Sequence, residues 1–311
     1  MLQALIERLL RPVHNPGERT GVLLDRGGAW IAGVAAAEGE LRLALNRRVP
    51  FKRNPFSEEA GREAIVAAGT ALAEFLRSAD AGRYNPVRIA LPDPAVNLAV
   101  FELDAMPKTR RERDELARWL FKKELYLDAD NLACVARDLG ADGGRKLLLA
   151  AAVAGAWTDG IGHALRGFGI FPAALGVSAI SVFNALPGGG GRNGALLSFE
   201  NDFWSLLLWD EAMRPRLLRG YWREQADAVT DPELRGIVSE AERLITSYVR
   251  AGSGRRIEKI YVAGGAPSAR RFVGLLNERL SEEAAYVDFS GRCRDPAAGI
   301  PACCYALCGE A

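Results

Sequence analysis

The hydrophobic pattern of this chain changes from the period of a strand to that of a helix, and it does so twice. The first apolar runs are short and separated by turn residues, which is typical of an antiparallel meander. These runs span 21–24, 30–36 and 41–45. Apolar positions then recur at helical spacing and predict a helix over 57–77, with Ser57 as its N-cap. Three strands and a helix therefore form one unit.

The same order restarts after Pro187 and the four glycines at 188–191, whose composition is that of a linker. Strands are expected at 194–199, 203–209 and 216–219. A helix over 230–251 follows, and then a strand that ends at the pair Gly264 and Gly265. Ser268 is the expected N-cap of the next helix. The two halves thus share an element order, which indicates an internal duplication of topology.

A further set of elements lies between the first meander and the glycine linker. Strands are expected at 87–91, 95–103, 131–138 and 146–153. Thr109 and Glu112 have capping-box spacing, so a helix should begin there and run to about Tyr126. The side chains of this helix expected to face the core are Leu116, Trp119, Leu120 and Leu125. Two more helices are expected at 156–166 and 173–186.

An amphipathic helix is predicted at the N-terminus. Its apolar stripe consists of Leu2, Leu5, Ile6, Leu9 and Leu10. Prolines at 12 and 16 and the glycine at 17 end the helical pattern. Two interpretations stay open: the stripe packs on its own domain, or it docks on a partner, a second copy of the chain or a membrane surface. These five residues are the candidate partner-binding residues.

These patterns predict four segments. Residues 1–16 form the N-terminal helix and linker, and residues 17–187 form a first domain with an inserted α+β subdomain at about 86–172. A second domain follows at 188–296, and a C-terminal helix at 297–311. The fold class is therefore α/β, in two similar halves.

Composition and charge remove several classes of function. The 311 residues are 49% hydrophobic and 25% charged, as in an ordinary globular protein. Forty basic residues against 39 acidic ones give a net charge of +1, so nucleic acid is not an expected partner. No apolar run approaches the ~18 residues that span a bilayer, and no signal-peptide cleavage site is recognisable. We expect a cytoplasmic protein.

Two local features admit more than one interpretation. The basic loop 47–56, with Phe51 and Phe56, offers phosphate and stacking contacts to a nucleic acid, or is a solvated loop. Cys304 and Cys308 are four residues apart on an expected helix, and they are zinc ligands or small buried hydrophobic residues of a reduced protein. The second interpretation is favoured in both cases.

The pair Gly264 and Gly265 is the strongest candidate for ligand chemistry. A strand that ends in two glycines before a helix lets a flat ligand approach the backbone, and the helix offers free N–H groups. A nucleotide can be cradled in this way. The alternative is an ordinary tight connection between a strand and a helix.

Taken together, the duplicated meanders, the hinge and the late glycine pair resemble the actin-like ATPase (ASKHA) fold. Within that fold, four segments resemble the PilM family of type IV pilus assembly proteins over nearly the whole chain, a family related to the cytoplasmic part of GspL. These segments are Val87–Asp93, Leu148–Ala152, Leu165–Pro172 and Ile257–Gly265.

Nucleotide-binding members of the fold carry an Asp-x-Gly turn in each half, where backbone N–H groups hold phosphate and the aspartate positions a hydrated metal ion. The resemblance makes Asp25, Gly27, Gly28, Gly264 and Gly265 the candidate nucleotide-binding residues. In the second half, Ser198 stands for the aspartate and Glu200 for the glycine. A carboxylate where phosphate would sit is repulsive, so we expect a vestigial cleft, no metal site and no catalytic residues.

The resemblance implies a cytoplasmic scaffold of an inner-membrane type IV pilus or type II secretion complex, a pseudo-ATPase rather than an active enzyme. Its expected partner is the short cytoplasmic tail of a bitopic inner-membrane protein, docked in a groove of the first domain, with a homodimer as a further partner. It reaches the membrane only through such partners. No cofactor is expected. The alternative is an active ATPase or small-molecule kinase that uses ATP and Mg²⁺ with Asp25 as the metal-positioning acid.

Overall fold

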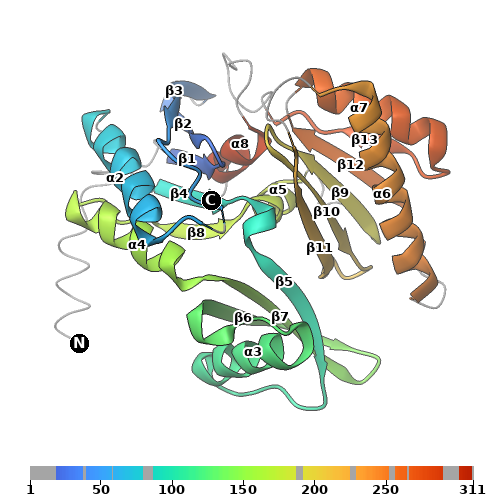
Figure 1. Ribbon diagram of the computed structural model, residues 1–311. Coiled ribbons are helices and arrows are strands. Elements are labelled where there is room, and N and C mark those ends of the chain that lie inside the picture. Colours follow the sequence, from blue (N-terminus) through green and yellow to red (C-terminus); the bar gives the residue numbers. More distant parts are fainter. Residues whose placement is uncertain are drawn as a thin grey trace.

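The computed structural model forms two five-stranded sheets and one three-stranded sheet from the residues that it describes (Figure 1). These residues are 19–37, 40–57, 59–79, 87–186, 192–224, 229–251, 256–264, 266–289 and 301–309. None of the helices in these ranges is both long enough and apolar enough to cross a membrane.

The first sheet contains the predicted meander and has the strand order β3-β2-β1-β4-β8. Its strands are β1 (Arg19–Leu24), β2 (Gly28–Ala37), β3 (Glu40–Pro50), β4 (Val87–Leu91) and β8 (Ala174–Val177). The first three strands are antiparallel, whereas β4 runs parallel to β1 and β8 runs parallel to β4. Helices α2 (Arg62–Ser78) and α4 (Gly155–Gly167) supply the apolar side chains that cover one face of the sheet.

The second sheet repeats this topology with the order β11-β10-β9-β12-β13. Its strands are β9 (Gly194–Phe199), β10 (Phe203–Trp209), β11 (Pro215–Trp222), β12 (Lys259–Gly264) and β13 (Ala284–Tyr286). Again three antiparallel strands are followed by two parallel ones. Helices α6 (Asp231–Ala251) and α7 (Ala266–Arg279) pack on its outer face. The internal duplication expected from the sequence is confirmed as a duplication of strand order.

A three-stranded subdomain projects from the first half. It contains β5 (Asn97–Leu103), β6 (Leu132–Asp142), β7 (Arg145–Ala154), α3 (Arg110–Leu125) and the 3-10 turn η2 (Ala129–Asn131), and it is preceded by the 3-10 turn η1 (Asp93–Ala95), which contacts β10 and β11. The capping box of α3 is confirmed: the Glu112 N–H donates to Thr109 Oγ1 at 3.2 Å, and the Thr109 N–H donates to the Glu112 carboxylate at 3.0 Å. The predicted inner face of α3 is wrong at two positions, because Trp119 is 52% exposed and Leu125 is 41% exposed.

Three predicted helix starts also differ from the structure. The expected helix 173–186 is a strand, β8, followed by α5 (Ser178–Asn184), because the edge of β4 takes up residues 174–177 as a hydrogen-bonded neighbour. Ser57 does not cap α2: the helix begins at Arg62, and Ser57 Oγ instead donates to the Asn54 carbonyl. Ser268 lies within the first turn of α7 rather than before it.

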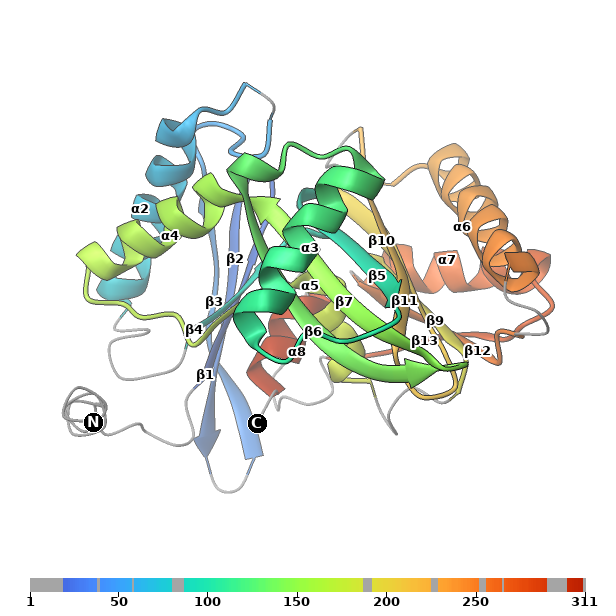
Figure 2. The ribbon, with the colours of Figure 1, turned by 90° about the horizontal axis from the view of Figure 1, so that it is seen from below.

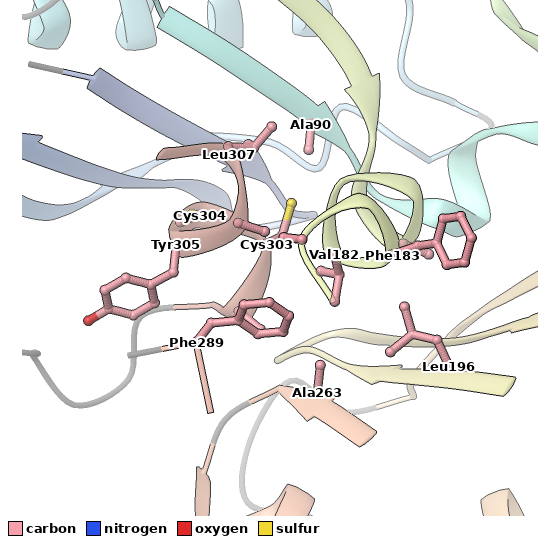
Figure 3. Packing of buried hydrophobic residues seen from close by; sticks show 14 of the residues in the cluster. Ala90, Val182, Phe183, Leu196, Ala263, Phe289, Cys303, Cys304, Tyr305 and Leu307 are labelled. Atoms are coloured by element: carbon pink, nitrogen blue, oxygen red, sulfur yellow. The ribbon is translucent and has the colours of Figure 1, made fainter. Parts of the chain in front are cut away.

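The two sheets are joined by a continuous apolar core that contains α5 and α8 (Ala302–Gly309). Figure 3 shows Val182 of α5 beside Cys303 of α8, with Ala90 of the first half on one side and Leu196 and Ala263 of the second half on the other. Gly21 of β1 permits this packing, since a Cβ there would lie 2.5 Å from the Cys304 carbonyl oxygen. The domain boundaries expected from the sequence stay predictions, although β4 belongs to the first sheet rather than to the projecting subdomain.

Candidate functional site

Two short turns, one from each half, meet at the junction of the sheets. Asp25–Gly27 joins β1 to β2, and Glu200–Asp202 joins β9 to β10. The same backbone hydrogen bond closes both turns. The Asp25 N–H donates to the Gly28 carbonyl at 2.8 Å, and the Glu200 N–H donates to the Phe203 carbonyl at 3.0 Å. Asp25 is therefore equivalent to Glu200, and Gly27 to Asp202.

This equivalence corrects the alignment made from the sequence, in which Ser198 replaced the aspartate and Glu200 the glycine. Ser198 lies inside β9, where it pairs with Ser205 of β10 and Ala263 of β12. Because β9 continues to Phe199, the turn begins two residues later than the sequence alignment assumed. The second turn thus keeps an acidic residue at its start and has a second one in place of the glycine.

The Asp25 carboxylate is buried and saturated by its own half. One oxygen accepts from the Gly27 N–H, and the other from Trp30 Nε1, both at 2.8 Å. Arg48 Nη2 lies 3.2 and 3.3 Å from the two oxygens and forms an ion pair with the carboxylate. These donors occupy lone pairs that a hydrated metal ion would need. Asp25 is thus held by protein groups.

Close packing between strands explains why two of the candidate positions, Gly28 and Gly264, are glycine. A Cβ on Gly28 would lie 2.4 Å from the Val49 carbonyl oxygen, and one on Gly264 would lie 1.9 Å from the Phe199 carbonyl oxygen. Gly264 also has φ +144°, a conformation that L side chains rarely adopt. Gly27 is less constrained, because its Cβ would meet only the end of the flexible Arg48 side chain, at 2.9 Å. Gly265 lies outside the described residues.

Arg26 joins the two turns directly. Its backbone N–H donates to Asp202 Oδ2 at 2.7 Å, and its Nε lies 3.3 Å from the same oxygen. Its guanidinium also donates to the carbonyls of Asp202 and Arg223 and stacks over the ring of Trp222 at 5.1 Å. A backbone N–H of the first turn, the type of group that holds phosphate in this fold, is therefore already bonded to a carboxylate of the second turn.

Glu200 is the most perturbed acid of the junction. It is 4% exposed, and its Oε1 has no hydrogen-bond partner among the described residues. Burial, together with the nearby charges of Asp93, Asp202 and Asp25, raises its pKa to about 8, although the Cys303 N–H at the start of α8 donates to the carboxyl and acts in the opposite direction. At neutral pH this group is mostly a protonated, uncharged acid.

Asp93 belongs to the same site, although it was not among the candidate residues expected from the sequence. Its Oδ1 accepts from the Ala179 N–H at 2.8 Å in the first turn of α5, and its Oδ2 accepts from Ser205 Oγ of β10 at 2.6 Å. Burial raises its pKa to about 6, and the two hydrogen bonds lower it in part. The sequence feature that could have identified Asp93 is its position between two prolines, directly after a buried strand.

The site so assembled is unfavourable for phosphate. Asp25, Asp93, Glu200 and Asp202 are all buried, with at most 4% of each exposed, and they lie at one junction, where a phosphate would face the carboxylates of Asp25, Asp93 and Asp202 in a low-dielectric interior. Burial and the nearby Asp25 also raise the pKa of Asp202. The residues present therefore do not fit a magnesium-bound triphosphate as the turns of nucleotide-binding members do.

The remaining candidates fall elsewhere. Asp210, an acid that a kinase could use as a general base, lies at the other end of β10, where Arg214 and Arg216 bind it in a hairpin turn. Phe56 is not an exposed stacking platform, because it stacks on Trp157 at a centroid distance of 4.0 Å. The partner-binding candidates Leu2, Leu5, Ile6, Leu9 and Leu10 lie outside the described residues.

The cysteines of α8 pack in the apolar core. Cys303, Cys304 and Cys308 are buried and take part in no disulfide among the described residues, as expected for small hydrophobic side chains. The sulfur of Cys308 lies 3.3 Å from the Ala32 carbonyl oxygen, and that of Cys304 lies 3.5 Å from the Trp30 carbonyl oxygen. Their contacts are therefore with the first sheet. No group of acidic, histidine or cysteine side chains suited to a metal ion was found within the described part of the chain.

No protein-family model matches the chain, and no curated protein matches it in sequence. Solved structures do match. A PilM–PilN type IV pilus biogenesis complex matches with a TM-score of 0.68 and 19% identity over 89% of this chain and 90% of the matched chain. A Bacteroides thetaiotaomicron protein of actin-like ATPase fold and unknown function matches with a TM-score of 0.52 and 10% identity over 87% and 91% of the two chains.

A third structure, the cytoplasmic domain of EpsL from the Vibrio cholerae type II secretion system, matches more weakly, with a TM-score of 0.48 and 13% identity over 79% and 82% of the chains. The first two matches, with the duplicated sheets, show that the chain has the actin-like ATPase fold.

Proposed function

We propose that this chain is a cytoplasmic actin-like scaffold of an inner-membrane type IV pilus or type II secretion assembly complex and that it does not hydrolyse ATP. The observation that carries the proposal is the direct bond between the two turns, Arg26 to Asp202, with Glu200 buried beside it. The structural likeness to a PilM–PilN complex supports the assembly role.

The groups that the turns already bind support the proposed absence of hydrolysis. Asp25 is neutralised by Arg48, and the Arg26 N–H donates to Asp202. Opening the cleft for a nucleotide would break these bonds and leave buried carboxylates unpaired, which is strongly unfavourable. We therefore assign the junction a mechanical role, since the bond from Arg26 to Asp202 links the two halves directly.

Calorimetry with ATP and Mg²⁺ tests this part of the proposal. We expect weak or undetectable binding by the full chain. Tight, magnesium-dependent binding that survives Glu200→Ala and is lost in Asp25→Ala would instead establish the active ATPase or kinase alternative.

For the partner, we propose that the cytoplasmic tail of a bitopic inner-membrane protein docks on the first half, against the edge strand β8. This strand ends the first sheet, and its edge faces the three-stranded subdomain (Figure 1). Phe171 is 69% exposed just before it, and Leu175 within it is 38% exposed. Val135, on the face of the subdomain sheet opposite α3, is 52% exposed. An edge strand with apolar neighbours suits an extended peptide.

The test uses a synthetic peptide with the tail sequence of the bitopic protein encoded beside this chain. We expect Leu175→Asp and Phe171→Ser to weaken peptide binding roughly tenfold or more, since both remove apolar contact at the proposed groove. Trp119→Gln, on the opposite side of the subdomain, is the matched control and should bind normally. Equal binding by all three variants would reject this docking surface.

A further inference from the structure

The outer face of α3 carries an exposed surface that the proposed function does not use. We define the α3 patch as Trp119, Lys122, Lys123, Leu125 and Tyr126. Four of these residues are spaced three or four apart, so they share one helix face. Figures 1 and 2 show α3 on the underside of the molecule, away from the second half and on the far side of the subdomain sheet from β8. The patch is thus separate from the proposed tail groove.

Tyr126 provides an observation independent of exposure. It ends α3 in the left-handed conformation, with φ 54° and ψ 29°, a position that glycine or asparagine normally occupies. A tyrosine there adds steric strain, and its side chain is 90% exposed. The folded chain gains almost no burial from this ring. The strained position therefore holds an aromatic side chain out in solvent.

The charged side chains of the patch are Lys122 and Lys123. Of the neighbouring acids on α3, Glu115 is paired with Arg111, and the exposed Glu124 lies on a different side of the helix from Trp119. Lys123 Nζ lies 4.6 Å from the centre of the Trp119 ring, and Lys122 and Lys123 form no ion pair within the described part of the chain. Tryptophan, tyrosine and leucine beside lysines match the interface of an anionic bilayer, where aromatic rings sit at headgroup depth and lysine stems extend toward phosphates. A protein partner fits less well, because lysine is depleted at the centres of protein interfaces.

We propose that the α3 patch binds the surface of an anionic lipid bilayer directly. The lysines attract the lipid phosphates, and Trp119 and Tyr126 enter the headgroup region. This contact goes beyond the proposed scaffold function, in which the membrane is reached only through protein partners, and it does not depend on the identity of any partner.

Vesicle flotation of the full chain tests the proposal. We expect the protein to float with phosphatidylglycerol–phosphatidylethanolamine vesicles at millimolar lipid, and not with phosphatidylcholine vesicles. Lys122→Glu with Lys123→Glu should lower the partition coefficient by about tenfold or more, and added salt should lower it as well. Tyr126→Gly should weaken partitioning several-fold while relaxing the backbone, so its effect cannot be assigned to unfolding.

The matched control reverses two exposed arginines of α6, Arg235→Glu with Arg250→Glu, and should float as the unmodified chain does. Flotation that is absent, equal on neutral vesicles, or unaffected by the lysine reversals would overturn the proposal. Tail-peptide binding is measured on the same variants. Trp119→Gln is included in both measurements. If it no longer binds the tail peptide but still binds vesicles, the α3 patch is a protein interface, and the lipid-binding proposal is overturned. This result leaves the scaffold proposal standing, so the failures of the two proposals can be told apart.

Discussion

The turns Asp25–Gly27 and Glu200–Asp202 share a backbone frame but differ in how their acids are satisfied. In the first turn, one carboxylate receives donors from Gly27, Trp30 and Arg48. In the second, Glu200 and Asp202 each keep a buried oxygen without a hydrogen-bond partner in the described structure. The duplicated fold has thus preserved the hairpin geometry while its side-chain chemistry diverged. The turns now bind each other through Arg26, where nucleotide-binding members hold a shared ligand.

The largest expected effect comes from Glu200→Gln. The folded-state pKa of about 8 lies above the ordinary value of 4.5, so the folded protein retains this proton to higher pH than the unfolded chain does. The stability that depends on the protonated acid is complete below about pH 4.5 and is lost as the pH rises toward 8. Glutamine cannot ionise, so the variant should be more stable by on the order of 3–5 kcal/mol at alkaline pH.

Chemical denaturation of both proteins at acidic and alkaline pH measures this difference, which should nearly vanish in acid. Glu278→Gln, an exposed change on α7, is the control and should show no such dependence. A Glu200→Gln difference that grows in acid would mean that the second turn holds a stabilised carboxylate, as the first does.

The next effect tests the bond between the turns. Arg26→Ala leaves the Asp202 carboxylate buried without its guanidinium and should lower the free energy of unfolding by about 2–4 kcal/mol. Adding Asp202→Asn should recover part of the loss, and a double-mutant cycle measures the coupling. Arg111→Ala removes an exposed pair with Glu115 and should leave the free energy of unfolding nearly unchanged. Additive losses at Arg26 and Asp202 would show that the turns are not energetically coupled.

A smaller effect is expected from alanine substitutions at two adjacent glycines, Gly27 in the first turn and Gly28 at the start of β2. Gly28→Ala should destabilise the fold by about 1–3 kcal/mol, because its Cβ meets the fixed Val49 carbonyl. Gly27→Ala should cost less, since the Arg48 side chain can move. Thermal unfolding of both variants provides the comparison. The reverse order would indicate that Gly27, rather than strand packing, sets the geometry of the turn.

The smallest effect concerns the link from β10 to η1. Ser205→Ala removes the hydroxyl that donates to Asp93 and should destabilise the protein by roughly 1–2 kcal/mol. The pKa of Asp93 should rise further, since one of the bonds that lowers it is lost. The loss should therefore be larger at pH 8 than at pH 5. A pH-independent loss would mean that packing alone explains it.

Element order was predictable because each meander has turn residues between apolar runs, as at Asp25–Gly28. The start of α3 was also predictable from the local sequence, because Thr109 and Glu112 form the expected capping box. The second turn was misaligned because Ser198 and Glu200 both fit the end of an apolar run, and only pairing with β10 and β12 fixes where β9 ends. Residues 174–177 were predicted to be helical because a short apolar run has no decisive period.

The site was less predictable than the fold. The resemblance made Asp25 and the glycines candidates, and their nucleotide-binding role stays a prediction. The partners that neutralise Asp25 come from β2 and β3, and the sequence pattern does not indicate them. Asp93 contributes through contacts with Ser205 and α5, which lie 112 and 86 residues away in the sequence. Trp119 was expected to face the core because it belongs to the apolar stripe of α3. The sequence does not show that this stripe is wider than the sheet that covers it.

The position of α8 has a kinetic consequence. Cys308 contacts Arg19 across a separation of 289 residues, and the same helix contacts β2 and the second half. Contacts between such distant segments form late, after local hairpins and helices, because a very long loop must close first. Each sheet can assemble before α8 docks, with Gly21 and the facing apolar strands still open to water. The docking of α8 between the halves is therefore expected to be the rate-limiting step of folding. The apolar surface that α8 covers is expected to be the region through which an incompletely folded chain aggregates.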